Sequence, residues 1–344
     1  MSSLLKPSYS VRLGGQVWSE QLIGLELELE AAPLLDRAVV TLPAAAPLKA
    51  AVDDPVEVTL NSGEKEERVF SGSIAAIRRG LDCITVTSLN AGGRLAQFRP
   101  GVTYENVTSA SVIRSLASEC GVQTGRLEQG VSLTYYVADP SRNALEHIAR
   151  LSAWTGALAR ITAENRLESF IVNAAQAEVA LRYGRELLEL EQRRVSAPVE
   201  SFVAAGESGV GSHTDPAALR PVTDFFGGNR PDGPSFTHRW RFEPALRTAQ
   251  SAATAGAALK RSYLAAAGRG VFKAFLQPHL RPGMVVEIQE SPSGLPGGPV
   301  WIGGVRHQIG CGGARTAARF LQGGSAFDPA ALLGSMAGAL RGLL

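Results

Sequence analysis

Few residues in this 344-residue chain have the types and spacing that catalysis requires. Ser212, His213 and Asp215 are the residue types of a catalytic triad, but they stand almost consecutively in a segment rich in Gly and Pro. A triad needs groups that meet in space on rigid supports, so this cluster does not predict one. The motifs Gly-x-Ser-x-Gly, His-Glu-x-x-His and Gly-x-x-x-x-Gly-Lys-[Ser/Thr] are also absent from the sequence.

The residues with metal-ligand or acid–base chemistry are similarly isolated. His307 and Cys311 have a spacing that a metal could use, but no third ligand is near them in sequence, so we interpret them as a strand histidine and a buried thiol. Asp53 and Asp54 precede a proline and indicate a turn rather than an acid–base pair. Asn106 begins a glycosylation pattern that has no function without secretion. We therefore predict no catalytic residue, cofactor or metal site, and a protein that is not an enzyme.

The composition excludes several other classes of protein. The chain has 34 Lys and Arg residues against 32 Asp and Glu residues, so its net charge of +2 provides no basic surplus for binding nucleic acid. Three cysteines without a Cys-x-x-Cys pair argue against a disulfide scaffold or a zinc knuckle. Hydrophobic residues make up 45% of the chain, which is enough for well-packed cores.

The chain also carries no recognisable targeting or membrane signal. Its first residues lack a charged segment followed by an apolar one, and no run of about 18 apolar residues occurs. We expect no membrane span and a soluble protein that is made in the cytoplasm.

The elements that must position these residues begin with a β region over residues 8–98. Apolar and acidic residues alternate over residues 25–30, which is the period of a strand with one wet face. About six such strands at short spacing predict a sandwich or small barrel. The acidic face formed by Glu26, Glu28 and Glu30 is either solvated or meets a basic ring on a partner.

Residues 100–204 have a different pattern, which predicts a small α/β insert. Thr108 can cap a helix over residues 109–119, and Gly121 can end it. A second helix opens after Asp139 and ends at Gly156, with apolar residues at spacings of three and four. Two short apolar segments then predict a strand pair. We predict that Trp154, like Trp18 in the β region, belongs to a core.

The last third of the chain predicts a loop, a helix, a second β region and a tail. Residues 205–234 are rich in Gly, Pro, Ser and Asp and predict a long exposed loop, and residues 244–266 predict an Ala-rich helix. Residues 328–344 predict an amphipathic helix that either packs on its own domain or is donated to a neighbour. The apolar positions of that helix are Leu332, Leu333, Met336, Leu340, Leu343 and Leu344.

A short internal echo links the two β regions. Phe70-Ser-Gly-Ser-Ile74 and Trp301-Ile-Gly-Gly-Val305 share an aromatic residue, a Gly two positions on and a β-branched residue four positions on. Each follows a strand that begins after a proline, and each precedes a turn and a final strand. The match is short enough to arise by chance. If it is real, two related β domains flank the insert.

These patterns divide the chain into four parts. We predict a first β-barrel domain over residues 1–99, an α/β insert domain over 100–204, an exposed loop with a second β-barrel domain over 205–325, and a helical tail over 326–344. The fold class is mainly β with an α+β insert.

Two segments of the sequence resemble the phage late control protein D and VgrG family. The first is Tyr-Tyr-Val-Ala-Asp-Pro-Ser-Arg-Asn-Ala-Leu-Glu-His-Ile at residues 135–148, where a strand leads into a helix. The second is Val305-Arg-His307 followed by Gly313-Ala-Arg-Thr316, which looks like a strand pair of that family's second barrel. The resemblance covers most of residues 8–325 by order of elements. The chain differs from fused family members because it stops before any spike domain.

The resemblance implies a structural baseplate hub of a contractile phage tail or a phage-tail-like injection system. Such hubs are homotrimers with two tube-like barrels in each chain, and they adapt a hexameric tail tube to a trimeric spike. The implied partners are the tail tube protein, the spike protein, other baseplate components and a tape-measure or cargo protein. The implied location is a virion tail or injection particle assembled in the cytoplasm. The alternatives are a distal tail adaptor of a non-contractile phage and a carbohydrate-binding β-sandwich.

Overall fold

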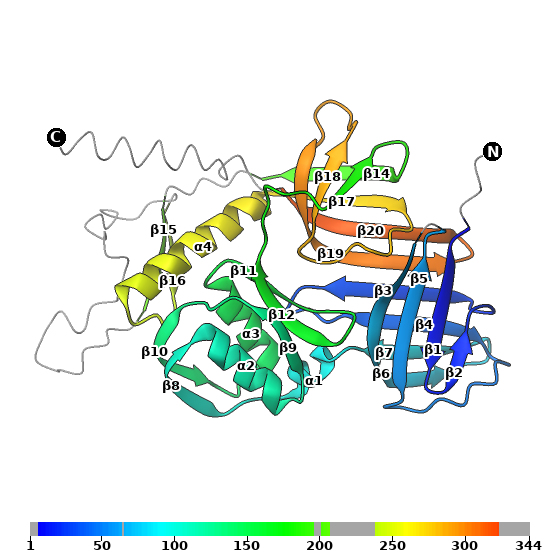
Figure 1. Ribbon diagram of the computed structural model, residues 1–344, viewed down its shortest axis with the longest axis horizontal. Helices are drawn as coiled ribbons and strands as arrows, with labels where there is room; N and C mark the ends of the chain where they lie inside the picture. Colours follow the sequence, from blue (N-terminus) through cyan, green and yellow to red (C-terminus); the bar gives the residue numbers. More distant parts are fainter. Residues whose placement is uncertain (1–5, 64, 196–200, 207–237, 323–344) are drawn as a thin grey trace, which may run out of the picture.

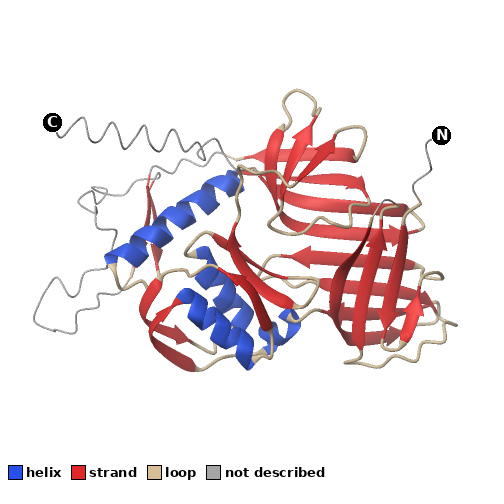
Figure 2. Ribbon diagram, viewed as in Figure 1, coloured by secondary structure: helices blue, strands red, loops and turns tan. Residues whose placement is uncertain are grey.

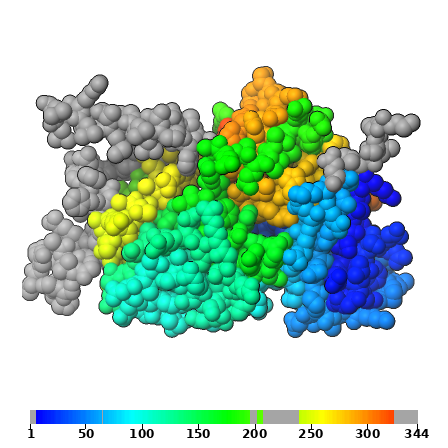
Figure 3. Space-filling view, in the orientation of Figure 1, coloured from blue at the N-terminus to red at the C-terminus, as the bar shows by residue number. Residues whose placement is uncertain are grey.

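The computed structural model describes residues 6–63, 65–195, 201–206 and 238–322 (Figure 1). Strands dominate this part of the chain, and the helices gather on the side away from the N-terminal strands (Figure 2). The space-filling view shows the N-terminal strands and the insert side by side, with the C-terminal strands above them (Figure 3). The prediction of a mainly β protein is therefore confirmed.

The first β region contains seven strands with strong alternation. They are β1 (Ser8–Leu13), β2 (Gln16–Trp18), β3 (Gly24–Glu30), β4 (Arg37–Pro43), β5 (Pro55–Asn61), β6 (Glu66–Arg79) and β7 (Cys83–Leu89). In β3 every leucine is buried and every glutamate is partly exposed, as its period of two predicts. The second β region contains β13 (Val179–Arg182), β14 (Leu187–Arg194), β17 (Gly268–Phe275), β18 (Val285–Gln289), β19 (Gly298–Gly310) and β20 (Gly313–Leu321).

Both β regions form one 13-stranded sheet within the described residues. Its order is β14-β17-β20-β19-β3-β4-β7-β6-β5-β1-β2, and β18 and β13 branch from β19. The buried faces of both regions share one apolar core, which includes Leu27, Phe70, Phe272 and Phe320. The antiparallel pairing of β3 with β19 joins the two regions through the backbone.

The two regions repeat one strand order. In chain order, β1, β3, β4, β5, β6 and β7 lie in the sheet as β1-β5-β6-β7-β4-β3, and β13, β14, β17, β18, β19 and β20 lie as β13-β18-β19-β20-β17-β14. One pair differs, because β1 is antiparallel to β5 whereas β13 is parallel to β18. The repetition of the whole order is a stronger signal of kinship between the regions than the short sequence echo.

Backbone contacts also show how the two regions align residue by residue. The N–H of Ile74 donates to the carbonyl of Asp54, and the N–H of Ile302 donates to the equivalent carbonyl of Met284. In return, the N–H of Asp53 donates to the carbonyl of Ile74, and the N–H of Gly283 donates to the carbonyl of Ile302. Both Asp53 and Gly283 have positive φ. Bulges follow Ile74 and Ile302 in the pairing with the next strand. The predicted match of Phe70 with Trp301 is therefore wrong by three residues, because it rested on residue types and not on these contacts.

The α/β insert follows β7 and ends at Ile171, earlier than the predicted residue 204, because β13 and β14 belong to the large sheet. Its apolar core also includes Leu246 and Ala252 from the region of α4 (Ala249–Ala267). Its helices are α1 (Gly92–Gln97), α2 (Ser109–Glu119) and α3 (Ala144–Ala153). Its strands are β8 (Val102–Thr108), β9 (Gln123–Leu127), β10 (Ser132–Ala138), β11 (Ala157–Ile161) and β12 (Arg166–Ile171). The strands form two small sheets, β10-β8 and β11-β12-β9. Trp154 and Tyr136 lie at the centre of the second apolar core.

A further pair of strands and the longest described helix lie between β14 and β17. The strands β15 (Ser201–Ala205) and β16 (His238–Phe242) are parallel neighbours, and α4 (Ala249–Ala267) packs against β15. The predicted Ala-rich helix is confirmed, although Thr248 caps it, so it begins at Ala249. The predicted loop from residue 207 onward and the predicted tail helix lie outside the described residues.

The helices predicted in the insert are confirmed, and their caps explain their ends. The side-chain oxygen of Thr108 accepts a bond from the Ser111 N–H and begins α2, as its sequence predicts. The second predicted helix begins later than Asp139, because Asn143 and Glu146 form a reciprocal capping box. Both Trp18 and Trp154 are buried, as predicted.

Candidate functional site

The junction between β3 and β19 is a candidate functional surface because its glutamates and arginines form a ladder of ion pairs across the four strands β20, β19, β3 and β4. Arg306 lies 2.7 Å from Glu26, and Arg37 lies 2.9 Å from Glu28. Arg319 pairs with Glu30. The acidic face was expected to be solvated or to meet a basic partner. Instead, its glutamates pair with arginines of the same chain.

The charges in this ladder alter the titration of the glutamates. Burial raises the pKa of Glu26, but the hydrogen bond and the charge of Arg306 outweigh this effect and hold the pKa below its usual range. Burial dominates at Glu30 and raises its pKa, although Arg319 opposes the shift. Glu26 is therefore a firm anion at neutral pH. The ion pairs of the ladder favour the same register of β3 against β19 that the backbone hydrogen bonds set.

His307 and Thr316 form a buried polar pair between β19 and β20. Nδ1 of His307 lies 2.9 Å from Oγ1 of Thr316, and the N–H of Gln277 donates to the same oxygen at 2.8 Å. Burial, with nearby Arg281 and His279, lowers the pKa of His307 to about 3. The pair therefore fixes the segment that follows β17 to the sheet. The predicted strand histidine is confirmed, whereas the predicted burial of Cys311 is wrong, because Cys311 lies exposed in the β19–β20 turn.

The other residues with chemical potential remain separate. Asp53 and Asp54 lie in a turn, as predicted, and the carboxylate of Asp54 accepts the Ala51 N–H at 2.8 Å. Ser212, His213 and Asp215 lie outside the described residues. Among the described residues, no three His, Cys, Asp or Glu side chains lie close enough together to hold a metal ion. In the same part of the chain, no helix has the length and apolar character needed to span a membrane.

The sequence analysis missed Asp36, which joins the sheet to the insert. Its carboxylate accepts the Glu30 N–H at 2.6 Å and the Asn90 side-chain amide at 2.7 Å. Burial raises the pKa of Asp36 to about 7. The adjacent backbone is also fixed, because the N–H of Ala32 donates to the carbonyl of Ala159 in β11. No local motif marks Asp36, since Asn90 is 54 residues away in sequence.

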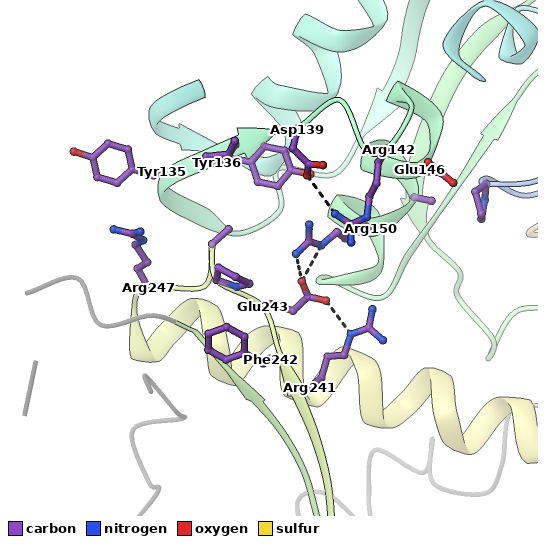
Figure 4. A pocket seen from close by; sticks show the side chains of 15 residues that line it. Tyr135, Tyr136, Asp139, Arg142, Glu146, Arg150, Arg241, Phe242, Glu243 and Arg247 are labelled. Atoms are coloured by element: carbon purple, nitrogen blue, oxygen red, sulfur yellow. Dashed lines mark hydrogen bonds and ion pairs between the residues drawn. The ribbon is translucent and has the colours of Figure 1, made fainter. Parts of the chain in front are cut away.

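A cleft of about 770 Å³ lies between the insert and the segment that leads from β16 to α4 (Figure 4). Glu243 projects into it and pairs with Arg150 from α3 and with Arg241. Tyr136 is buried beneath the cleft, and its hydroxyl lies 2.7 Å from Nδ1 of His147. Burial raises the pKa of Tyr136, so its hydroxyl stays protonated. The Arg150–Glu243 pair joins the insert to the segment before α4, whereas the Tyr136 hydroxyl contacts His147 within the insert. Each of these groups therefore already has a polar partner.

The described fold has clear counterparts among solved structures. A tail protein from Neisseria meningitidis MC58 has a TM-score of 0.70 at 12% identity, with 92% of this chain and 97% of that chain covered. The 43 kDa tail protein of prophage MuSo2 from Shewanella oneidensis has a TM-score of 0.67 at 13% identity, with 92% and 98% covered. The fold is that of phage tail proteins.

The same tail-protein fold extends to a secretion component. An E. coli protein of the type VI secretion system, described as structurally similar to the T4 bacteriophage tail proteins gp27 and gp5, has a TM-score of 0.61 at 12% identity. The alignment covers 90% of this chain and 76% of that chain. No protein-family model matches the sequence, and no curated protein matches it. At such low identities the likeness lies in the fold, so function must be argued from the chain's own surfaces.

Proposed function

We propose that this chain is a structural baseplate hub of a contractile phage tail or of a phage-tail-like injection system. In this role three copies form a ring that adapts a hexameric tail tube to a trimeric spike. The tail-protein fold, shared over nine tenths of the chain with two phage tail proteins, supports a place in such a particle. The assembly would form in the cytoplasm and become part of the tail or injection particle.

The repeated strand order is the observation that carries this proposal. Each chain contains two β regions with the same order of six strands, joined through β3 and β19. Three such chains present six similar modules to one neighbour and keep three-fold symmetry for another. A protein with a single module would have to match six-fold and three-fold partners with one surface.

In this proposal the chain has four parts with different tasks. The two tube-like domains are the first β region, β1 to β7, and the second β region, which takes in β13 and β14 as well as β17 to β20. The α/β insert over residues 92–171 lies between them in sequence, and residues 326–344 are the tail. The ring faces the tube protein on one side and the spike and other baseplate components on the other, and a tape-measure or cargo protein passes through its lumen. These contacts would be large protein interfaces that transmit load, and no covalent bond is made or broken.

The proposal is tested by the assembly state of the full chain. Light scattering and native mass spectrometry of the purified protein should give a trimer, either alone or after addition of candidate tube and spike proteins from the same genome. Electron microscopy of that species should show a ring with six similar lobes. A strict monomer that ignores both partners would contradict the proposed function.

A further inference from the structure

The joint between β19 and β3 has a counterpart that a single chain leaves incomplete. We propose that residues 76–79 of β6 pair, antiparallel, with the outer edge of β14 in a neighbouring copy of this chain. This inference rests on the proposed ring and identifies the strands that close it. The inner joint, β19 with β3, is the template for this outer joint.

The first half of the outer joint is the open edge of β6. In the inner joint, β19 pairs with β18 up to Trp301 and then offers residues 304–310 of the same edge to β3. In the first region, β6 pairs with β5 up to Ser73, and Ile74 bonds to the turn before β5. From residue 76 to the end of β6, the described structure places no strand on that edge.

The second half is the open edge of β14, which ends the sheet among the described strands. Matching the ladders pair by pair aligns β14 with β3. In the first region the ladder crosses β6, β7, β4 and β3 at Ile77, Val86, Val40 and Leu25. In the second it crosses β19, β20, β17 and β14 at Val305, Ala318, Phe272 and Leu190. β14 is thus placed to offer a neighbour the edge that β3 offers to β19.

Both open edges belong to a class of surface that monomers normally protect. Unpaired strand edges invite pairing with other chains, and soluble proteins cover them or make them very short. Leu81, at the tip of the hairpin that follows β6, is 97% exposed in the single chain. An exposed leucine beside an open edge is a feature that an interface covers.

The template also sets the register and the charges of the outer joint. Arg306 faces Glu28 across the inner joint and reaches diagonally to Glu26. At the equivalent places, Arg78 faces Arg193 of the neighbouring copy and reaches diagonally to the neighbour's Glu191. Arg193 also lies opposite Arg269 within its own chain. The outer joint therefore keeps one ion pair of the inner joint and replaces another with a repulsion between arginines.

Charge variants test this arrangement in opposite directions. Glu191→Arg should weaken the trimer about tenfold by removing the attraction of Arg78, and adding Arg78→Glu to that variant should restore it. Arg193→Glu should tighten the trimer about tenfold, because it restores the charge that Glu28 provides inside the chain. Arg114→Glu, on the exposed face of α2, is the control and should change nothing. Sedimentation equilibrium of the full chain gives the dissociation constants.

Cross-linking tests the register itself. Residues 76 and 195 occupy the places of Gly304 and Glu30, which face each other in the inner joint. With Cys311→Ser to remove an exposed thiol, Ala76→Cys with Val195→Cys should oxidise to a covalent trimer. Ala76→Cys with Arg193→Cys, offset by two residues, should cross-link far less. If the wild type forms a trimer, but the Ala76→Cys, Val195→Cys variant does not cross-link and Glu191→Arg does not weaken the trimer, this inference alone is overturned. A chain that never trimerises would overturn the proposed function with it.

Discussion

The buried site of His307 opposes the charged form of its ring. Burial lowers its pKa from 6.5 to about 3, so between these values the unfolded chain binds a proton that the folded chain refuses. The stabilising contribution of the neutral ring is complete above pH 6.5 and is lost as the pH falls toward 3. In that window His307 alone should lower the free energy of unfolding by up to about 1.4 kcal/mol per pH unit.

We predict that His307→Gln removes this pH dependence. The variant should be less stable than the wild type at pH 7.5, because Gln fills the site poorly and disturbs the bond to Thr316. The difference should shrink at pH 4.5, where the wild type bears the cost of excluding a proton. Urea denaturation at both pH values measures it, and a difference that stays constant would refute the role assigned to the ring.

Asp36 should show the opposite sign. Burial raises its pKa from 3.8 to about 7, so the folded chain holds a proton that the unfolded chain releases between these values. Its contribution to stability is complete below pH 3.8 and is lost as the pH rises through 7. The free energy of unfolding of Asp36→Asn should therefore fall furthest below that of the wild type at pH 5 and least at pH 8. The difference should change by up to about 1.4 kcal/mol per pH unit.

The same denaturation series, run from pH 5 to pH 8, measures this second effect. In the wild type, the contribution of His307 to stability rises with pH between pH 4 and pH 6.5 while that of Asp36 falls. The total stability should therefore vary little in this range. Asp36→Asn should expose the acid sensitivity of His307. A variant that follows the wild-type profile would mean that Asp36 is ionised at its site between β3 and Asn90.

At the scale of elements, local pattern predicted most strands and helices. Apolar and acidic residues alternate in β3, and apolar residues recur at spacings of three and four in α3. Each pattern indicates which face is buried, so both elements are predictable from short stretches of sequence. Partners distant in sequence were not predictable. The pairing of β3 with β19 joins residues about 280 apart, and nothing within either strand identifies the other. The site formed by Asp36 and Asn90 was missed for the same reason.

Gly72 shows how closely two strands approach near the bulge of β6. A Cβ added there would lie 2.2 Å from the carbonyl oxygen of Leu89, which a side chain cannot tolerate. We predict that Gly72→Ala destabilises the fold by about 2 kcal/mol or more, because β6 and β7 must separate. Gly15→Ala is the matched control, since its Cβ would meet nothing within 4 Å. Thermal denaturation should give a lower midpoint for Gly72→Ala than for the wild type, and an unchanged midpoint for Gly15→Ala. Equal midpoints for the two variants would contradict the close approach of Gly72 to Leu89.

At the scale of the whole molecule, the internal repeat links the single chain to its assembly. The near-neutral composition argued against a nucleic-acid-binding protein, but it could not show how many modules the chain contains. The strand order shows two, and the inner joint between them defines what an outer joint must look like. The register of that repeat was not predictable from the sequence echo, because only the backbone bonds of Ile74 and Ile302 define it.

The tail of residues 328–344 provides the last prediction, and its basis is the sequence pattern alone. Its apolar positions recur at spacings of three and four, which is the stripe of a helix that needs an apolar partner. The described residues of the two β regions already form an extensive apolar cluster among themselves, so we expect the tail to dock on a neighbouring chain. Deleting residues 328–344 should therefore leave the free energy of unfolding nearly unchanged and weaken assembly at least tenfold.

Urea denaturation and sedimentation equilibrium of the same truncated protein separate these two effects. Leu340→Asp in the full-length chain should reproduce the assembly defect, because a charge in the middle of the stripe blocks its docking. Arg341→Asp, next to it but off the apolar stripe, is the control and should assemble normally. If the truncated chain unfolds at lower urea but assembles as the wild type does, the tail serves its own domain. The ring would then depend on its strand edges for closure.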